Sequence, residues 1–143
     1  MTNSTVTDID ILAQVNSLLI ENRSIACKIA HKLGIETSSA TPGTGEAAEQ
    51  NNALAIRSQM LFKQIAAKLG VYVPSTPPLG GTLIEQNHLL LRQNRMVAME
   101  IANSLGITVV GTLSFVGSLV EQNRDLLTAN RSILLQVAET LGA

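Results

Sequence analysis

The stretch LIEQNHLLLRQNRMVAMEIANSLG, residues 83–106, returns in altered form as LVEQNRDLLTANRSILLQVAETLG at residues 119–142. Two looser copies precede it, at residues 11–34 and 47–70, and all four copies end in Leu-Gly with the glycines 36 residues apart. A fixed period of this length is the signature of a repeat architecture. The sequence therefore predicts a single domain over residues 1–143, built from four copies of one unit.

Each copy carries the start and stop signals of one long helix. Thr82 with Glu85, and Ser118 with Glu121, have the spacing of a capping box, in which a hydroxyl and a glutamate each accept from a backbone N–H. The Leu-Gly-aliphatic sequences that close the first three copies are typical of a Schellman stop. The pattern predicts a mainly α fold with helices near residues 8–33, 46–69, 82–105 and 118–141. Each helix of ~24 residues is roughly 36 Å long.

Apolar residues recur at helical spacing and give each predicted helix a wide stripe of the coiled-coil kind, with asparagines embedded in it. The six asparagines of the stripes are Asn22, Asn51, Asn87, Asn94, Asn123 and Asn130. A buried asparagine is costly unless its amide finds partners, and its best-attested role in helical bundles is to fix register and helix number. The sequence allows this register role. It also allows a position at the edge of the stripe, where the amides meet water.

The third copy has a second apolar line, formed by Leu89, Met96 and Met99. A helix that is apolar on two sides is expected to be buried on two sides. This helix is therefore predicted either to lie at the centre of the monomer or to meet another chain. In the second case, Leu89, Met96 and Met99 are candidate interface residues.

Connectors of eleven residues join the copies, at residues 35–45, 71–81 and 107–117. Helix connections in bundles usually take about two to eight residues. Eleven extended residues span roughly 36 Å, which equals one helix length. This match favours parallel helices with each connector running back along its helix, and the alternative is a four-helix bundle of antiparallel helices with generous loops. Residues 71–73 and 108–110 have the composition of short strands.

Composition narrows the class of partner and the compartment. Ten basic and eleven acidic residues are spread along the chain without a basic stripe, so nucleic acid is not an expected partner. Cys27 is the single cysteine, which excludes an internal disulfide and suits a reducing compartment. The start, MTNSTVTDIDIL, lacks the basic and apolar regions of a classical signal peptide. The default location is cytoplasmic, and extracellular release by another route is compatible with the sequence.

One uncharged stretch, NSLGITVVGTLSFVGSLV at residues 103–120, has nearly the length of a membrane span. In the other copies the same window is predicted to be a helix end, a connector and a helix start. The repeat register therefore argues against a membrane-spanning segment here.

Motifs that could carry chemistry are few. Glu85 and His88 have the Glu-x-x-His spacing of carboxylate-bridged di-iron bundles, but the neighbouring copies have no histidine at the second position. Cys27 and His31 share one helix face and supply at most half a metal site. No serine, cysteine or histidine pattern indicates a nucleophile with its base. The sequence predicts no catalytic, cofactor-binding or metal-binding residue, and hence no enzyme.

Two classes of function are compatible with these observations. The first is a non-enzymatic structural protein that self-associates through its apolar, asparagine-containing helix faces into a homo-oligomer or filament. Fourfold repetition and the second apolar line favour it. The second is a small helical binding module that holds a hydrophobic ligand or a partner helix. The dependence of molecular mass on concentration distinguishes the two.

Overall fold

The fold is built from four helices. The computed structural model describes residues 8–37, 45–73, 80–109 and 116–143. The helices are α1 (Asp8–Lys32), α2 (Ala47–Lys68), α3 (Leu83–Ser104) and α4 (Leu119–Leu141). These bounds lie within one residue of those predicted, which confirms the mainly α class. The described ranges contain no strand, so the strands expected at residues 71–73 and 108–109 are absent, and Val110 lies outside the described residues.

The capping boxes at the starts of α3 and α4 are confirmed. The Thr82 hydroxyl accepts from the Glu85 N–H at 3.2 Å, and the Glu85 carboxylate accepts from the Thr82 N–H at 3.1 Å. Ser118 and Glu121 make the same pair of bonds, both at 3.2 Å. By contrast, α2 begins after Glu46 without a side-chain cap. Helices α3 and α4 therefore have the better-defined starts.

The predicted helix stops are confirmed as well. Gly34, Gly70 and Gly106 have φ of +79°, +74° and +76°, the left-handed conformation that glycine adopts without a Cβ clash. The next residue then turns its N–H back to the last turn, as Ile35 does to the Ala30 carbonyl at 2.8 Å. These are the bonds of the Schellman motif, and they end each helix at the same point of its repeat.

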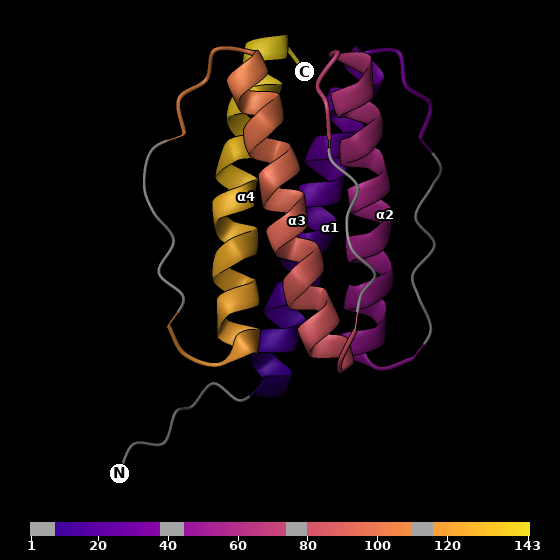
Figure 1. The fold of residues 1–143 in the computed structure, drawn as a ribbon. Helices are drawn as coiled ribbons and strands as arrows, with labels where there is room; N and C mark the ends of the chain where they lie inside the picture. The colour runs from indigo at the N-terminus through magenta and orange to yellow at the C-terminus, as the bar shows by residue number, and fades with distance from the viewer. Residues whose placement is uncertain (1–7, 38–44, 74–79, 110–115) are drawn as a thin grey trace.

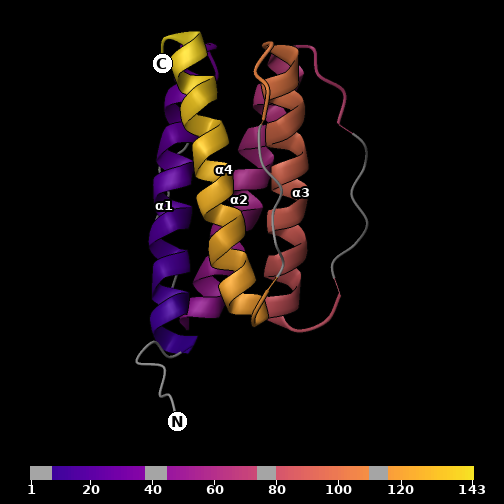
Figure 2. The ribbon, with the colours of Figure 1, turned by 90° about the vertical axis from the view of Figure 1, so that its left-hand side faces the viewer.

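All four helices run in the same direction, because each one starts at the lower end of the bundle in Figure 1 and ends at the upper end. The first residues of α1 and the C-terminus consequently lie at opposite ends. Helix α1 packs against α2 and α4, and α3 packs against the same two helices, so the four form a closed ring. Figure 2 shows α1 and α4 side by side from a second direction. Helix α3 is one member of this ring and does not lie at its centre.

The apolar core has two parts along the bundle axis. Toward the helix ends, residues one period apart gather in a buried apolar layer of Ile29, Ile65, Ile101 and Val137. Toward the helix starts, a second cluster includes Leu19, Leu90 and Leu126. Aliphatic residues from the described parts of the connectors pack on the first cluster, namely Ile35, Val71, Val73, Ile107 and Val109. The described connector residues that pack on this cluster are thus apolar. None of the four described helices is long and apolar enough to cross a membrane.

Candidate functional site

The six asparagines of the stripes are all buried, with 0–3% of their surface exposed. They belong to two sets of positions spaced one period apart, which we name the lower layer and the upper layer. The lower layer, nearer the helix starts, is Val15, Asn51, Asn87 and Asn123; the upper layer is Asn22, Ser58, Asn94 and Asn130. Their burial is incompatible with the alternative in which the amides meet water at the edge of the stripe.

Five of the six asparagines donate from the amide nitrogen to a backbone carbonyl of the preceding helix in the ring. Asn87 donates to the carbonyl of Ala48 at 3.2 Å, and Asn94 donates to that of Ala55 at 3.4 Å; both partners lie 39 residues earlier. Asn22 on α1 donates to the Leu127 carbonyl on α4 at 3.0 Å, a separation of 105 residues. In a ring of four 36-residue repeats, a step of 39 residues backward is equivalent to a step of 105 residues forward. The contact between α1 and α4 that closes the ring is therefore the same contact as those between the other neighbouring helices.

The amide oxygens of the lower layer also have partners. Asn16 donates to the Asn51 oxygen at 3.0 Å, and Asn52 donates to the Asn87 oxygen at 2.9 Å. The His88 Nδ1 lies 2.8 Å from the Asn123 oxygen. Because an amide oxygen only accepts, this contact requires the tautomer with hydrogen on Nδ1. In each case the donor lies 35 residues before the asparagine whose oxygen it bonds. The donor is therefore the residue directly after the lower-layer residue of the neighbouring helix, as Asn52 is directly after Asn51.

The oxygens of the upper layer lack such bonds. Among the described residues, no hydrogen-bond partner reaches the buried Oδ1 atoms of Asn22, Asn94 and Asn130 or the hydroxyl of Ser58. The side chains at the four donor positions given by the rule of the lower layer are longer, namely Arg23, Gln59, Arg95 and Arg131. Gln59 donates to Gln93 at 2.8 Å, and Arg131 pairs with Glu21 at 3.1 Å.

Arg95 is another of these longer side chains, and it occupies the position that His88 has one heptad earlier. Its Nη1 atom is buried and, within the described part of the chain, has no hydrogen-bond partner. Desolvation by burial lowers the pKa of the Arg95 guanidinium from its ordinary value. Arg95 and Asn130 lie one heptad after His88 and Asn123, which are in direct contact. In the upper layer, the corresponding donor on α3 and the oxygen on α4 are both buried and have no such contact.

The residues considered for metal binding are not brought together. In the described ranges, no group of three or more His, Cys, Asp or Glu side chains is placed to hold a metal ion. Glu85 caps α3, while His88 faces Asn123. His31 contacts the Thr37 hydroxyl at 3.0 Å. The neutral amides of the two layers can donate and accept hydrogen bonds, but they supply neither an acid nor a base.

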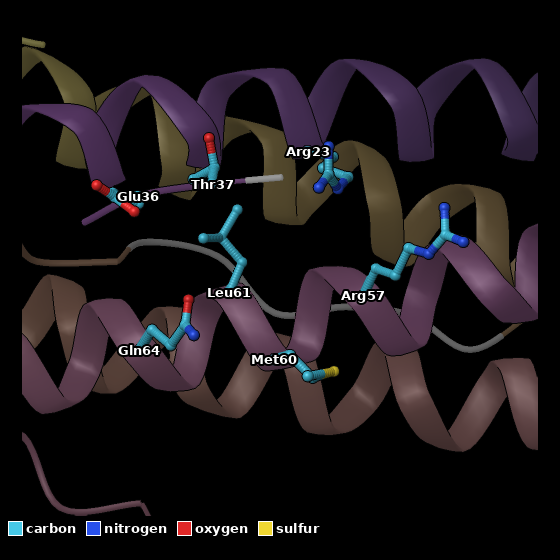
Figure 3. Close-up of a pocket in the computed structure, with 7 residues that line it drawn as sticks. All are labelled: Arg23, Glu36, Thr37, Arg57, Met60, Leu61 and Gln64. Atoms are coloured by element: carbon cyan, nitrogen blue, oxygen red, sulfur yellow. The ribbon is translucent and has the colours of Figure 1, made fainter. Parts of the chain in front are cut away.

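A groove of about 600 Å³ lies between α1 and α2, near the described start of the first connector (Figure 3). Arg23 on α1 and Arg57 on α2 stand on its opposite sides, and Leu61 points from α2 toward α1. The full lining is Arg23, Glu36, Thr37, Arg57, Met60, Leu61 and Gln64. The groove combines two guanidinium groups and the carboxylate of Glu36 with apolar side chains, and no sequence pattern predicts it.

The candidate interface residues of α3 differ in exposure. Met96 is 61% exposed and Leu89 is 40% exposed, whereas Met99 is half-buried against the apolar core. Met60, one period before Met96, is also 61% exposed. The outer surface of α2 and α3 thus presents large apolar side chains at equivalent positions.

The role of the repeated Glu-Gln-Asn triplet becomes clear only from the structure. In α3 the glutamate caps the helix, Gln86 donates to the Gly81 carbonyl at 3.0 Å, and Asn87 enters the core. Gln122 and Gln50 make the same bond to the carbonyls of Gly117 and Gly45. One triplet therefore ties down the helix start, the end of the connector and the lower layer. The repetition of the triplet can be seen in the sequence, but the glycine carbonyl that each glutamine bonds cannot be predicted from it.

The chain matches no family model, no curated protein and no solved structure. Its class rests on its own geometry, which is a single-chain bundle of four parallel helices closed around two polar layers.

Proposed function

We propose that this chain is a non-enzymatic structural protein that self-associates into a homo-oligomer or filament through the outer surface of its helical bundle. The observation that carries the proposal is the recurrence of exposed methionine at Met60 and Met96, together with Leu89 on the same helix as Met96. Single exposed apolar residues are ordinary, but a set that recurs with the repeat favours a contact surface.

The contacts between chains are expected on this outer surface because the asparagine-containing faces are already used. Each of the six asparagines is at most 3% exposed and lies in the interior of one chain. The hypothesis drawn from the sequence places these faces between chains. In the present proposal they hold the monomer together, and Leu89, Met60 and Met96 supply the surface for association.

The common direction of the helices supports a polar mode of assembly. Parallel helix dipoles add, which leaves positive partial charge at the lower end and negative partial charge at the upper end. The side chains oppose this dipole, because Glu49, Glu85 and Glu121 lie at helix starts and Lys32 and Lys68 lie at the ends of α1 and α2. The two ends of the bundle nevertheless differ in residue type. Unlike ends favour head-to-tail stacking, which is heterologous and open-ended.

Sedimentation velocity over a dilution series tests the proposal. The wild-type chain is expected to shift to higher mass as its concentration rises, and Met60→Gln/Met96→Gln is expected to weaken the shift. Ser24 and Ser132 occupy the equivalent exposed positions on α1 and α4, so Ser24→Gln/Ser132→Gln is the matched control. A monomer mass at every concentration would contradict self-association.

The groove between α1 and α2 favours a second candidate, a binding module for a hydrophobic ligand with an anionic group. Arg23 and Arg57 would attract the anion, and Leu61 and Met60 would contact the apolar part. The fluorescence of anilinonaphthalene sulfonate, titrated into wild type and Arg57→Gln, tests this candidate. Binding to a monomer that Arg57→Gln weakens would favour it over self-association.

A further inference from the structure

We propose that the upper layer is a binding site for internal water, held between the side chains of Asn22, Ser58, Asn94 and Asn130 inside the ring of helices. Each of these four residues is at least 97% buried, and each has an oxygen without a hydrogen-bond partner in the described part of the chain. Buried polar atoms in native proteins are almost always hydrogen-bonded to protein or to ordered water. The four residues stand at equivalent positions of four packed helices, so they lie at one level along the bundle axis.

The amide orientations in the upper layer are already determined by direct bonds. Asn22, Asn94 and Asn130 each use the nitrogen to donate to a backbone carbonyl of the preceding helix, at 3.0, 3.4 and 3.5 Å. Rotating an amide to pair its oxygen would remove that bond. The oxygens therefore need a donor that comes from outside the asparagine layer.

The repeat register gives Arg95 the donor position for one of these oxygens, that of Asn130. In the lower layer, His88 bonds Asn123 across α3 and α4 at 2.8 Å. Arg95 and Asn130 have the same 35-residue separation, yet Arg95 Nη1 and Asn130 Oδ1 are both buried and unbonded. A water molecule accepts from a guanidinium and donates to an amide oxygen, so it can bridge such a pair.

The residue types favour water over an ion. A metal cation would meet only neutral oxygens, with no carboxylate in the layer to balance its charge. An anion would meet three amide oxygens that can only accept hydrogen bonds. Water both donates and accepts, and internal waters in proteins typically make about three hydrogen bonds.

Ser58 has the smallest side chain of the upper layer. At this position the other three repeats have asparagine, whereas serine has a shorter side chain and still offers a hydroxyl. Its hydroxyl is buried without a partner, like the three amide oxygens. The substitution of serine for asparagine thus removes volume from the layer while keeping a polar group that water can bond.

Nuclear Overhauser spectra that detect water next to the asparagine side-chain amides test the inference in ¹⁵N-labelled protein. Long-lived water is expected at the amides of Asn94 and Asn130, and none at those of Asn51 and Asn87 in the same molecule. Ser58→Ala removes a hydroxyl whose exchanging proton gives similar signals, so the Asn94 signal must persist in that variant. Absence of long-lived water at the upper layer, or equal signals at both layers, would overturn the inference.

A variant and a salt series sharpen the test. Arg95→His copies the donor that His88 provides, so the water signal at Asn130 is expected to fall while that at Asn94 remains. The wild-type spectrum decides the matter even if this variant fails to fold. Melting temperatures in sodium, potassium and choline chloride at equal ionic strength are expected to agree. A higher melting temperature with one metal cation would indicate that this ion, and not water, binds in the upper layer. That result would overturn the assignment.

Discussion

In the lower layer Asn51 and Asn87 use both ends of their amides, whereas in the upper layer Asn94 and Asn130 bond only through the nitrogen. The nitrogen bonds of Asn51 and Asn87 are 3.2 Å long, whereas in the upper layer they are 3.0 Å for Asn22, 3.4 Å for Asn94 and 3.5 Å for Asn130. The backbone register is the same in both layers. The difference must therefore come from the side chains that surround each amide.

The residue that follows each layer position on the neighbouring helix explains the difference. Asn16, Asn52 and His88 are short enough to reach the adjacent amide oxygen directly. In the upper layer, Gln59 reaches across to Gln93 instead. Two repeats can therefore have a buried asparagine at equivalent positions and still differ in its hydrogen bonds. The side chain on the neighbouring helix decides whether the amide oxygen has a donor.

Truncation of one amide in each layer is expected to give the largest difference. Asn87→Ala leaves the Asn52 amide and the Ala48 carbonyl without their partner and should lower the free energy of unfolding by about 3 kcal/mol. Asn94→Ala removes one long bond and an oxygen that has no protein partner, so its cost should be about 1 kcal/mol. Urea denaturation measures both values. Equal losses would contradict the comparison.

Leucine in place of the same asparagines tests the register role. Asn94→Leu replaces an incompletely bonded amide by an apolar group and should leave the free energy of unfolding unchanged or raise it by up to about 1 kcal/mol. Asn87→Leu should lower it by about 2 kcal/mol, because it strands the Asn52 donor. The double variant should broaden the distribution of oligomers in sedimentation velocity if the amides fix register. A single unchanged species would count against that role.

An exchange of donors between the layers should have a smaller effect. Arg95→His offers Asn130 the donor that His88 offers Asn123 and is expected to stabilise the bundle by about 1 kcal/mol. His88→Arg is the reverse change and is expected to destabilise it by about the same amount. Thermal unfolding followed by circular dichroism measures both at neutral pH. Shifts of the same sign in the two variants would be inconsistent with the proposed role of this position.

The smallest expected effect concerns pH and the cap beside the lower layer. Bonds from Thr82, first from its backbone N–H and then from its side chain, lower the pKa of Glu85 below its ordinary value of 4.5. A lowered folded-state pKa contributes stability above the unfolded value, and that stability is lost as the pH falls through the folded value. Glu85→Gln should therefore lower the melting temperature slightly at pH 7 and less at pH 3. A larger loss at pH 3 would reverse the assigned sign.

The sequence predicts the bounds of the helices better than it predicts the hydrogen-bond partners of the buried asparagines. Glycine stops at Gly34, Gly70 and Gly106 and hydroxyl caps at Thr82 and Ser118 act on neighbouring residues, so the helix bounds follow from local chemistry. The equal length of helix and connector favours parallel helices because it is a geometric constraint on the chain.

The bonding of the two layers is not predictable in the same way. The donors to the lower layer are Asn16, Asn52 and His88, which share a position but not a residue type. A period also cannot show whether equivalent faces meet within one chain or between chains, because both arrangements satisfy the same apolar stripe. The groove between α1 and α2 depends on how two helices and a connector lie together, and no single segment encodes it.

The central claim is that four parallel helices in one register bring the asparagines into two layers. The most direct test is a distance between spin labels at Leu83 and Leu119, the first residues of α3 and α4, in a chain with Cys27→Ala. Dilution with unlabelled protein removes distances between molecules. Parallel neighbours predict a separation below about 20 Å, because packed helix axes lie about 8 to 10 Å apart. A separation near 36 Å, roughly one helix length, would show antiparallel neighbours and contradict the account.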